Sequence, residues 1–399
     1  MKSLRILASR IGLLHKIGFS NKVNFCLNVI ESKLKRTRLF SHPVVLDIVP
    51  TKLCNLNCIF CIQYDTEGAK SLARDDFDRI AKTLFPYAWY VNFCSGGEPF
   101  LNRDFLYFLD TCRKYKVLIS IVSNGMLLTE EITRTLVLND YLEVFSFSFD
   151  GARSQTVESI RRGVKFQKVV DNMRLMADMK RRYRRNFPTL QIRCAVMKRN
   201  IEELPDVIRS ARVWGINRVV VNFLNVANDI DKNESLFYHP DLTRRVFSEA
   251  SRIASSEHVG LELPELPTGE TIERPCYFPW RFFKIDPEGS AKFCYKAWNN
   301  PIGNFFKTDR FFDLWNSEHY QLIRKTVNGP KPYFRYCSIC SVRRGSGAEN
   351  AHIQYLDDSL YDFDRDYRAS LHSEIPERVI THARNERGIQ KNTEAPGRL

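Results

Sequence analysis

The sequence of 399 residues contains no apolar run long enough to span a bilayer. Its first segment, MKSLRILASRIGLLHKIGF, interrupts each apolar stretch with a basic side chain, which a secretory signal would not do. No recognisable nucleic-acid-binding motif is present, and no internal repeat occurs beyond an alternation of strand-like and helix-like segments. These absences predict a cytoplasmic protein without membrane-spanning helices and without a nucleic-acid partner.

Acidic residues are scarce relative to basic ones. The chain has 60 Lys and Arg against 46 Asp and Glu, which gives a net charge of +14. Residues 1–40 hold many of these bases against Glu31 alone, and a second basic run covers residues 180–185. A basic amphipathic segment fits a solvated helix face or an anionic surface. We favour the solvated face and keep weak membrane-surface contact through the N-terminus as the alternative.

Strand-like and helix-like patterns alternate through the first two thirds of the chain. An apolar stripe at helical spacing runs through residues 204–214 and is stopped by Gly215. Such alternation predicts an α/β fold with a parallel sheet, here a partial (β/α)6 barrel of the TIM type. Its functional groups belong at the C-terminal ends of the strands. The predicted strands are Val44–Ile48, Tyr90–Phe93, Leu118–Val122, Val144–Phe149, Leu190–Val196 and Val219–Phe223.

The alternation of strand-like and helix-like segments ends near residue 260, where prolines interrupt the helical pattern and short strand-like segments follow. We therefore predict four parts: a basic helical extension (1–43), the barrel (44–260), a small cysteine-rich α+β domain (261–350) and a C-terminal extension (351–399) with a mobile tail. The apolar positions of the N-terminal extension are expected either to dock a peptide or to cap the open side of the barrel.

Eleven cysteines in a reducing compartment favour metal chemistry over disulfides. Cys54, Cys58 and Cys61 fall within eight residues, shortly after the first predicted strand. Three thiolates leave a metal centre one ligand short, which suits a closed zinc site poorly. They suit a [4Fe–4S] cluster, whose fourth iron would stay open for a cofactor or substrate.

This C-x3-C-x2-C motif, with Phe60 before its third cysteine and a strand–helix repeat around it, resembles the signature of radical S-adenosylmethionine (radical SAM) enzymes. The resemblance implies that the open iron binds the amine and carboxylate of S-adenosylmethionine. One electron then breaks its S–C5′ bond, and the resulting 5′-deoxyadenosyl radical takes a hydrogen atom from substrate. An electron donor of the flavodoxin or ferredoxin type is implied as well.

Other motifs of that family follow in its order, covering about residues 44–225. Gly96, Gly97 and Glu98 end the second strand and resemble the motif that holds the methionine amine. The third and fourth strands end in polar segments that resemble the family's contacts to the ribose and the methionine carboxylate of S-adenosylmethionine. A stretch that resembles the family's SxDG…RxG motif begins at the end of the fourth strand. Arg193 on the fifth strand is a candidate partner of the methionine carboxylate. The residues predicted to bind the cofactor are Phe60, Gly96, Gly97, Glu98, Ser123, Asn124, Ser148 and Arg193.

Four further cysteines, Cys276, Cys294, Cys337 and Cys340, have the spacing C-x17-C-x42-C-x2-C. Four thiolates close either a zinc site or a fully ligated [4Fe–4S] cluster. The segment resembles the SPASM/twitch extension of radical SAM enzymes, which implies one auxiliary [4Fe–4S] cluster. A full SPASM domain has further cysteines, and Ser346 stands about where the next would fall. Cys94 is expected to line the cofactor pocket or to be a small buried group, and Cys26, Cys112 and Cys194 to be buried.

The four-cysteine set predicts an oxidoreductase in which the auxiliary cluster accepts the electron of the substrate radical. The basic balance, and a spacing that resembles an aminocyclitol dehydrogenase, favour a small sugar or cyclitol as substrate. A peptide-modifying maturase is the first alternative, a redox-neutral epimerase or lyase the second, and a non-catalytic zinc protein a remote third. Asp150, Asp286 and Glu288 are candidate bases by type only and otherwise turn residues, so no catalytic residue is assigned.

Overall fold

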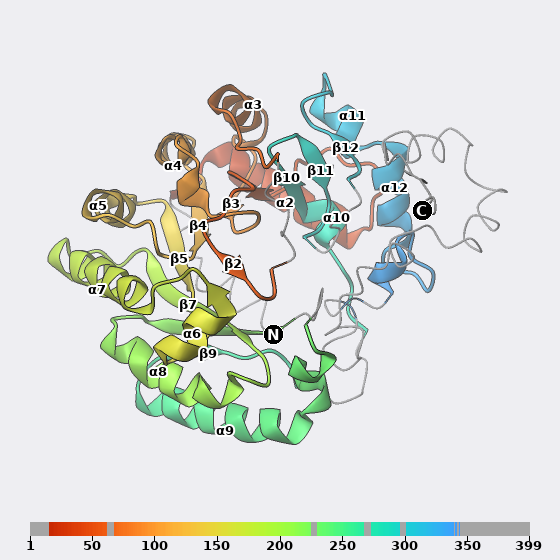
Figure 1. Ribbon diagram of the computed structural model, residues 1–399. Coiled ribbons are helices and arrows are strands. Elements are labelled where there is room, and N and C mark those ends of the chain that lie inside the picture. The colour runs from red at the N-terminus through yellow and green to blue at the C-terminus, as the bar shows by residue number, and fades with distance from the viewer. Residues whose placement is uncertain are drawn as a thin grey trace, which may run out of the picture.

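The computed structural model describes residues 16–61, 68–224, 230–266, 273–295, 301–338, 340 and 343. One ten-stranded sheet dominates it, in the order β12-β11-β10-β1-β3-β4-β5-β7-β8-β9 (Figure 1). Its strands are β1 (Val45–Ile48), β3 (Tyr90–Phe93), β4 (Leu118–Ser123), β5 (Leu142–Ser148), β7 (Thr189–Val196), β8 (Arg218–Phe223), β9 (Gly260–Glu262), β10 (Phe282–Ile285), β11 (Ser290–Lys292) and β12 (Gly303–Asn304). A separate antiparallel pair joins β2 (Asn57–Cys58) to β6 (Arg161–Arg162).

All neighbouring strands from β10 to β9 pair in parallel, and helices cross over between them, as the alternating pattern predicted. The fold class is therefore confirmed: an α/β partial barrel, with every predicted strand present to within two residues. The helices are α2 (Phe19–Lys33), α3 (Arg74–Leu84), α4 (Phe105–Lys114), α5 (Glu130–Leu138), α6 (Ser154–Ile160), α7 (Phe166–Arg182), α8 (Leu204–Val213), α9 (Pro240–Ser256), α10 (Phe278–Arg281), α11 (Phe311–Trp315) and α12 (Glu318–Thr326).

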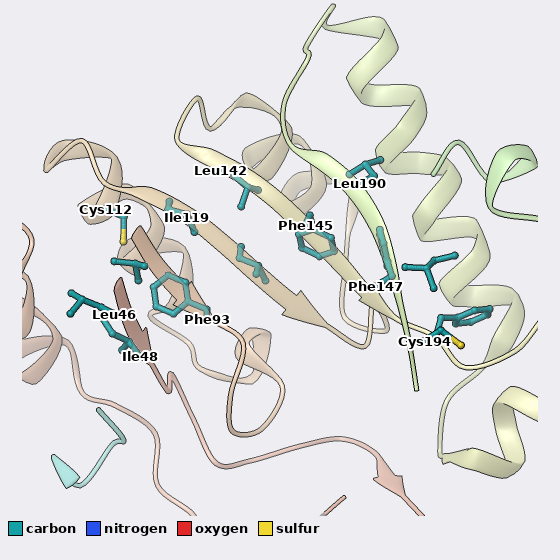
Figure 2. Packing of buried hydrophobic residues seen from close by; sticks show 14 of the residues in the cluster. Leu46, Ile48, Phe93, Cys112, Ile119, Leu142, Phe145, Phe147, Leu190 and Cys194 are labelled. Carbon is teal, nitrogen blue, oxygen red and sulfur yellow. The ribbon is translucent and has the colours of Figure 1, made fainter. Parts of the chain in front are cut away.

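Each strand turns alternate residues to the two faces of the sheet, and the two faces differ in chemistry. The outer face packs against the crossover helices and is apolar (Figure 2); it includes Leu46, Ile48, Phe93, Ile119, Phe145, Phe147, Leu190 and Cys194. The residues between them carry polar groups towards the inside of the barrel, among them Asp47, Asn92, Ser120, Ser146, Gln191 and Arg193. The polar inner face is where a polar cofactor and substrate can be held.

The C-terminal cysteine-rich segment continues the same sheet. β10 pairs in parallel with β1 over four residues, and the hairpin partners β11 and β12 extend it. The segment is therefore hydrogen-bonded directly to the strand that leads into the first cysteine group. The predicted extension at 351–399 lies outside the described residues.

Helix α2 packs in an unusual orientation, with polar side chains inward and apolar ones outward. Asn21, Asn24 and Asn28 are buried, whereas Phe19 is 82% and Ile30 56% exposed. Most apolar positions of α2 therefore do not cap the barrel; the exception is Phe25, whose ring lies 4.4 Å from that of Trp89 between centroids. Buried backbone carbonyls need donors, and the asparagine amides supply them.

The other scattered cysteines divide between the two environments. Cys26 lies on the outward side of α2 and is exposed, so the prediction that it is buried is wrong. Cys112 and Cys194 are buried as predicted. Among the helices of the described ranges, none combines the length and the apolar character that a bilayer crossing needs.

His42 supplies a stability prediction that depends on pH. Its ring stacks on Tyr87 at 3.8 Å between centroids and on Phe311 at 5.4 Å, and burial lowers its pKa to about 4. An unfolded histidine titrates near pH 6.5. Between about pH 6.5 and pH 4, His42 is therefore protonated in the unfolded chain and neutral in the native chain. Stability from His42 is therefore complete above about pH 6.5 and falls as the pH drops towards 4.

Urea unfolding of the native protein and of His42→Phe, which keeps a stacked ring and removes the titration, checks this expectation. Relative to the variant, the wild-type midpoint should fall between about pH 7.5 and pH 5. A difference between the two proteins that does not change with pH would contradict it. Effects of carboxylates elsewhere cancel, because both proteins carry them.

Candidate active site

The first cysteine group lies where β1 ends, at the C-terminal edge of the parallel strands. Cys58 belongs to the short pair formed by β2 and β6, which fixes the loop against residues 161–162. Burial raises the pKa of the Cys58 thiol to about 11, Arg161 opposes the shift, and the nearby thiols of Cys61 and Cys54 add to it. The three thiols thus lie close enough to influence one another, as ligands of one centre must.

The glycines after β3 pack against the backbone that leads into this loop. The Gly97 amide donates to the Thr51 carbonyl, and the Glu98 amide donates to the Leu53 carbonyl, each at 2.8 Å. A Cβ atom on Gly97 would stand 1.8 Å from the Leu53 oxygen, so only glycine fits there. Gly96 has φ of +92°, a backbone conformation that glycine adopts readily. The motif therefore holds the cysteine loop in place through its backbone.

Glu98 joins the ends of β3 and β4. Its carboxylate accepts hydrogen bonds from the Ser123 hydroxyl at 2.7 Å and from the Asn124 amide at 2.8 Å, and burial raises its pKa to about 7 despite them. The Asn124 side chain in turn donates to Asn55 in the cysteine loop, at 2.8 Å. Three predicted cofactor residues are thus gathered beside the first cysteine group.

A buried ion pair supports the cysteine loop from behind. Arg161 lies 2.7 Å from Asp150, whose side chain is completely buried. The guanidinium also approaches the Cys58 sulfur at 3.9 Å and stands 5.4 Å from the centre of the Phe60 ring. Asp150 accepts a further hydrogen bond from the Ala195 amide on β7. Asp150 is therefore a structural anchor, and neither a turn residue nor an available base.

The remaining predicted cofactor residues lie on neighbouring strands. Ser148 on β5 and Arg193 on β7 are register partners. Within the part of the chain that the structure describes, the Nε atom of Arg193 is buried without a hydrogen-bond partner. Cys94 faces the inside of the barrel, where its side chain is accessible to solvent. Desolvation by the surrounding protein raises the pKa of its thiol to about 11. This position fits the interpretation that Cys94 lines the cofactor pocket.

The other two candidate bases are turn residues. Asp286 accepts hydrogen bonds from the Ser290 and Glu288 amides in the turn between β10 and β11. Glu288 forms an ion pair with Lys52 at 2.6 Å, and Asp286 lies 3.6 Å from the same ammonium group. These contacts tie the segment before Cys54 to the C-terminal hairpin.

The thiols of the second cysteine group lie near enough to one another to interact electrostatically. Burial raises the pKa of the Cys337 thiol, and its neighbours Cys294, Cys276 and Cys340 raise it further. The Asn328 side chain clamps Cys276, accepting from its amide at 2.7 Å and donating to its carbonyl at 3.0 Å. In the described ranges no three His, Cys, Asp or Glu side chains converge as ligands of one metal ion. Thiolates that bind different irons of a cluster do not need such convergence.

Two groups on the inner face were missed from the sequence. Tyr295 is 40% exposed, and its pKa is raised by partial burial and by the thiols of the second cysteine group, while Arg193 opposes the shift. Its ring packs against those of Phe278 and Phe282, at 5.2 and 6.2 Å between centroids. On β1 the Asp47 carboxylate accepts from Ser95 at 2.5 Å and lies 3.7 Å from Lys284. No motif marks these residues; for Asp47, only a charge within an apolar strand was a signal.

The inner face fits a polar, charged cofactor. Among the described residues, one Asp47 oxygen is buried without a hydrogen-bond partner, as is the Arg193 Nε. A buried polar atom that lacks a partner costs free energy, so such atoms mark places where a ligand completes the bonding. The thiols of the first and second cysteine groups supply the sulfur ligands that iron–sulfur clusters require.

Comparison with known proteins agrees with this geometry. Residues 48–211 match the radical SAM superfamily, and residues 276–341 match the SPASM iron–sulfur cluster-binding domain. The mycofactocin maturase MftC of Mycolicibacterium smegmatis is 22% identical over 298 residues, 71% of this chain and 72% of the relative. The subtilosin biosynthesis protein AlbA of Bacillus subtilis is 21% identical over 319 residues, 76% and 68%.

The fold has a counterpart among solved structures. Streptococcus suis SuiB bound to S-adenosylmethionine superposes with a TM-score of 0.61 at 19% identity, covering 74% of this chain and 71% of SuiB. The two matched domains imply S-adenosylmethionine, a [4Fe–4S] cluster that binds it and auxiliary iron–sulfur clusters as cofactors. The chain belongs to the radical SAM superfamily and carries a C-terminal SPASM domain.

Proposed function

We propose that this enzyme is a peptide-modifying maturase that oxidises a C–H position of a peptide substrate. The observation that carries the proposal is the similarity to MftC and AlbA, which covers more than two thirds of this chain and of each relative. MftC is a mycofactocin maturase, and AlbA takes part in making a bacteriocin. These relatives favour the peptide alternative over the sugar or cyclitol substrate that the basic balance and the cysteine spacing favoured.

We assign the first cluster to Cys54, Cys58 and Cys61, and the methionine end of S-adenosylmethionine to the groups beside them. The Glu98 carboxylate carries the charge that an ammonium group needs, and Ser123 and Asn124 keep it oriented. Arg193 offers a buried N–H to a carboxylate. Phe60 is held under Arg161, and Ser148 lies beside Arg193. When bound, the cluster and S-adenosylmethionine supply the radical that takes a hydrogen atom from substrate.

We assign one auxiliary cluster to Cys276, Cys294, Cys337 and Cys340. Loss of a hydrogen atom leaves the peptide one electron short of a stable product, so a second electron has to leave and a proton is released. The first cysteine group follows β1, and β1 pairs with β10 of the segment that carries the second group, which supports an electron acceptor near the substrate. Asp47 and Lys284 line the same inner face and can hold polar parts of the peptide. A one-electron donor of the flavodoxin or ferredoxin type completes the cycle.

The test is turnover of the anaerobically reconstituted enzyme with S-adenosylmethionine, dithionite and short peptides encoded beside its gene, against a panel of sugars and cyclitols. We expect a peptide to stimulate 5′-deoxyadenosine formation and to lose the mass of two hydrogens. Stimulation by a sugar or cyclitol alone would contradict the peptide assignment. A modified peptide of unchanged mass would contradict the oxidation.

A matched variant separates the electron acceptor from the radical chemistry. Cys276→Ala with Cys340→Ala should still form 5′-deoxyadenosine, because the first cysteine group is intact, but should yield little oxidised peptide. Oxidised product at the wild-type rate would contradict the role given to the second cysteine group.

A further inference from the structure

The outward side of α2 is an apolar stripe without a partner among the described residues. Its members recur every three or four residues, so they lie on one face of the helix. The exposed fractions are 82% for Phe19, 50% for Val23, 36% for Leu27, 56% for Ile30 and 63% for Leu34. We call these five residues the α2 stripe. Isolated exposed apolar side chains are ordinary, but a contiguous set of this kind marks an interaction surface.

The orientation of the helix is firmly set by its other side. Asn21 donates to the Phe85 and Ala88 carbonyls, at 2.8 and 2.5 Å, and Asn28 donates to the Trp280 carbonyl on α10 at 2.6 Å. Glu31 accepts from the Ser41 amide at 3.0 Å and hydroxyl at 2.6 Å. Turning the stripe inward would break these buried hydrogen bonds, each of which would leave an unpaired polar group. The outward stripe is therefore a stable feature of the fold.

The exposed charges at the C-terminal end of the stripe are of one sign. Glu31 is 1% exposed and its carboxylate is occupied by hydrogen bonds, so it offers no negative charge to a partner. The exposed charged side chains at the C-terminal end of α2 and just beyond it are all basic: Lys33, Lys35, Arg36 and Arg38. An apolar strip with a basic border is complementary to a surface with an apolar interior and anionic groups above it.

The basic surface continues past the start of α2. The Lys16 ammonium donates to the Asp140 carbonyl at 2.7 Å, and Arg185 forms an ion pair with the Asp140 carboxylate at 3.0 Å. Arg185 borders a cavity that also contains Lys180, Arg181, Arg184 and Arg212. Asp140 therefore links the basic cavity to Lys16, which lies three residues before Phe19 at the start of the α2 stripe.

Both features lie at the end of the barrel opposite to the cysteines. α2 binds the carbonyls of residues 85–88, which come just before β3, and the cavity includes Thr189 and Asn217, where β7 begins and just before β8 (Figure 1). The cysteine loop and Glu98 follow the C-terminal ends of β1 and β3. A partner bound to the α2 stripe would leave the mouth of the active site open.

We propose that the α2 stripe and its basic border dock the enzyme on an anionic lipid bilayer, with the active-site mouth facing away from the lipid. A second copy of the chain would bring two basic borders together. Residues 1–15 carry Lys2, Arg5 and Arg10 and no acid, so they have the same sign as the border. Among these occupants only the anionic bilayer satisfies both the apolar stripe and the charge. The inference does not depend on the peptide substrate.

Co-sedimentation of the reconstituted full-length enzyme with vesicles tests the proposal. We expect binding to vesicles of phosphatidylcholine and phosphatidylglycerol in equal parts, and little binding to phosphatidylcholine alone. Val23→Ser/Leu27→Ser/Ile30→Ser should weaken binding about tenfold or more, because three buried apolar contacts are lost. Lys33→Glu/Arg38→Glu should weaken it similarly and reduce its salt dependence.

The matched control changes exposed apolar residues elsewhere, Val213→Ser on α8 with Tyr238→Ser, and should bind like wild type. All these side chains are exposed, so the variants should fold, which retained S-adenosylmethionine cleavage verifies. Equal binding of wild type and the stripe variant would overturn the proposal. Two other results would also overturn it, both in the absence of vesicle binding by either protein. One is a wild-type dimer in sedimentation velocity that is monomeric in the stripe variant. The other is a loss of peptide binding in the stripe variant.

Discussion

Replacing Cys54, Cys58 and Cys61 together by alanine is expected to abolish reductive cleavage of S-adenosylmethionine while leaving iron in the C-terminal segment. The three thiols lie on a loop at the end of β1 and are coupled to one another. The second cysteine group has four thiols of its own on elements that follow β9. Roughly four irons and a matching amount of sulfide should therefore remain per chain, as one closed [4Fe–4S] cluster requires.

Iron and sulfide analysis of the anaerobically reconstituted variant, together with a 5′-deoxyadenosine assay, measures both effects. Cys26→Ala is the matched control, since that thiol is exposed on α2 at the other end of the barrel and should change neither value. A variant without iron would show that the C-terminal cysteines hold no cluster. The electron acceptor would then be missing, and a redox-neutral radical reaction would replace the oxidation.

The second large effect is expected from Arg161→Ala, which should lower the free energy of unfolding by about 3 to 5 kcal/mol. Arg161 and Asp150 form an ion pair at 2.7 Å with side chains only 10% and 0% exposed. Removing the arginine leaves a buried carboxylate without its counter-charge, and that penalty exceeds the worth of an exposed ion pair. Since Arg161 also lies against Cys58 and Phe60, cluster content should fall as well.

Urea unfolding of Arg161→Ala and of its neighbour Arg162→Ala measures the difference. Arg162 is exposed on the same two-residue strand, so its loss should cost well under about 1 kcal/mol. A cycle that adds Asp150→Ala and the double variant should give a coupling energy of about 2 kcal/mol. Equal effects of the two arginine substitutions would contradict the supporting role of the ion pair.

Local patterns in the sequence were sufficient for the fold class. The strands from Val45 to Phe223 carry β-branched and aromatic residues between helical stripes, and their order alone predicts parallel pairing. The short spacing of Cys54, Cys58 and Cys61 constrains these thiols to one loop whatever the rest of the chain does. Glycine at position 96 is readable because the turn after the strand has a positive φ there.

Tertiary structure decided the features that depend on which distant residues meet. Asp150 reads as a turn residue in the sequence, and only the return of residue 161 beside it makes it a buried anchor. The pairing of β1 with β10 brings the strand that leads into the first cysteine group beside the C-terminal cysteine-rich segment, across more than two hundred residues. For α2, helical periodicity identifies an apolar face and a polar face with equal clarity. Which of them is buried depended on the unpaired carbonyls that its asparagines meet, because an unmet buried hydrogen bond costs about as much free energy as burying an apolar side chain returns.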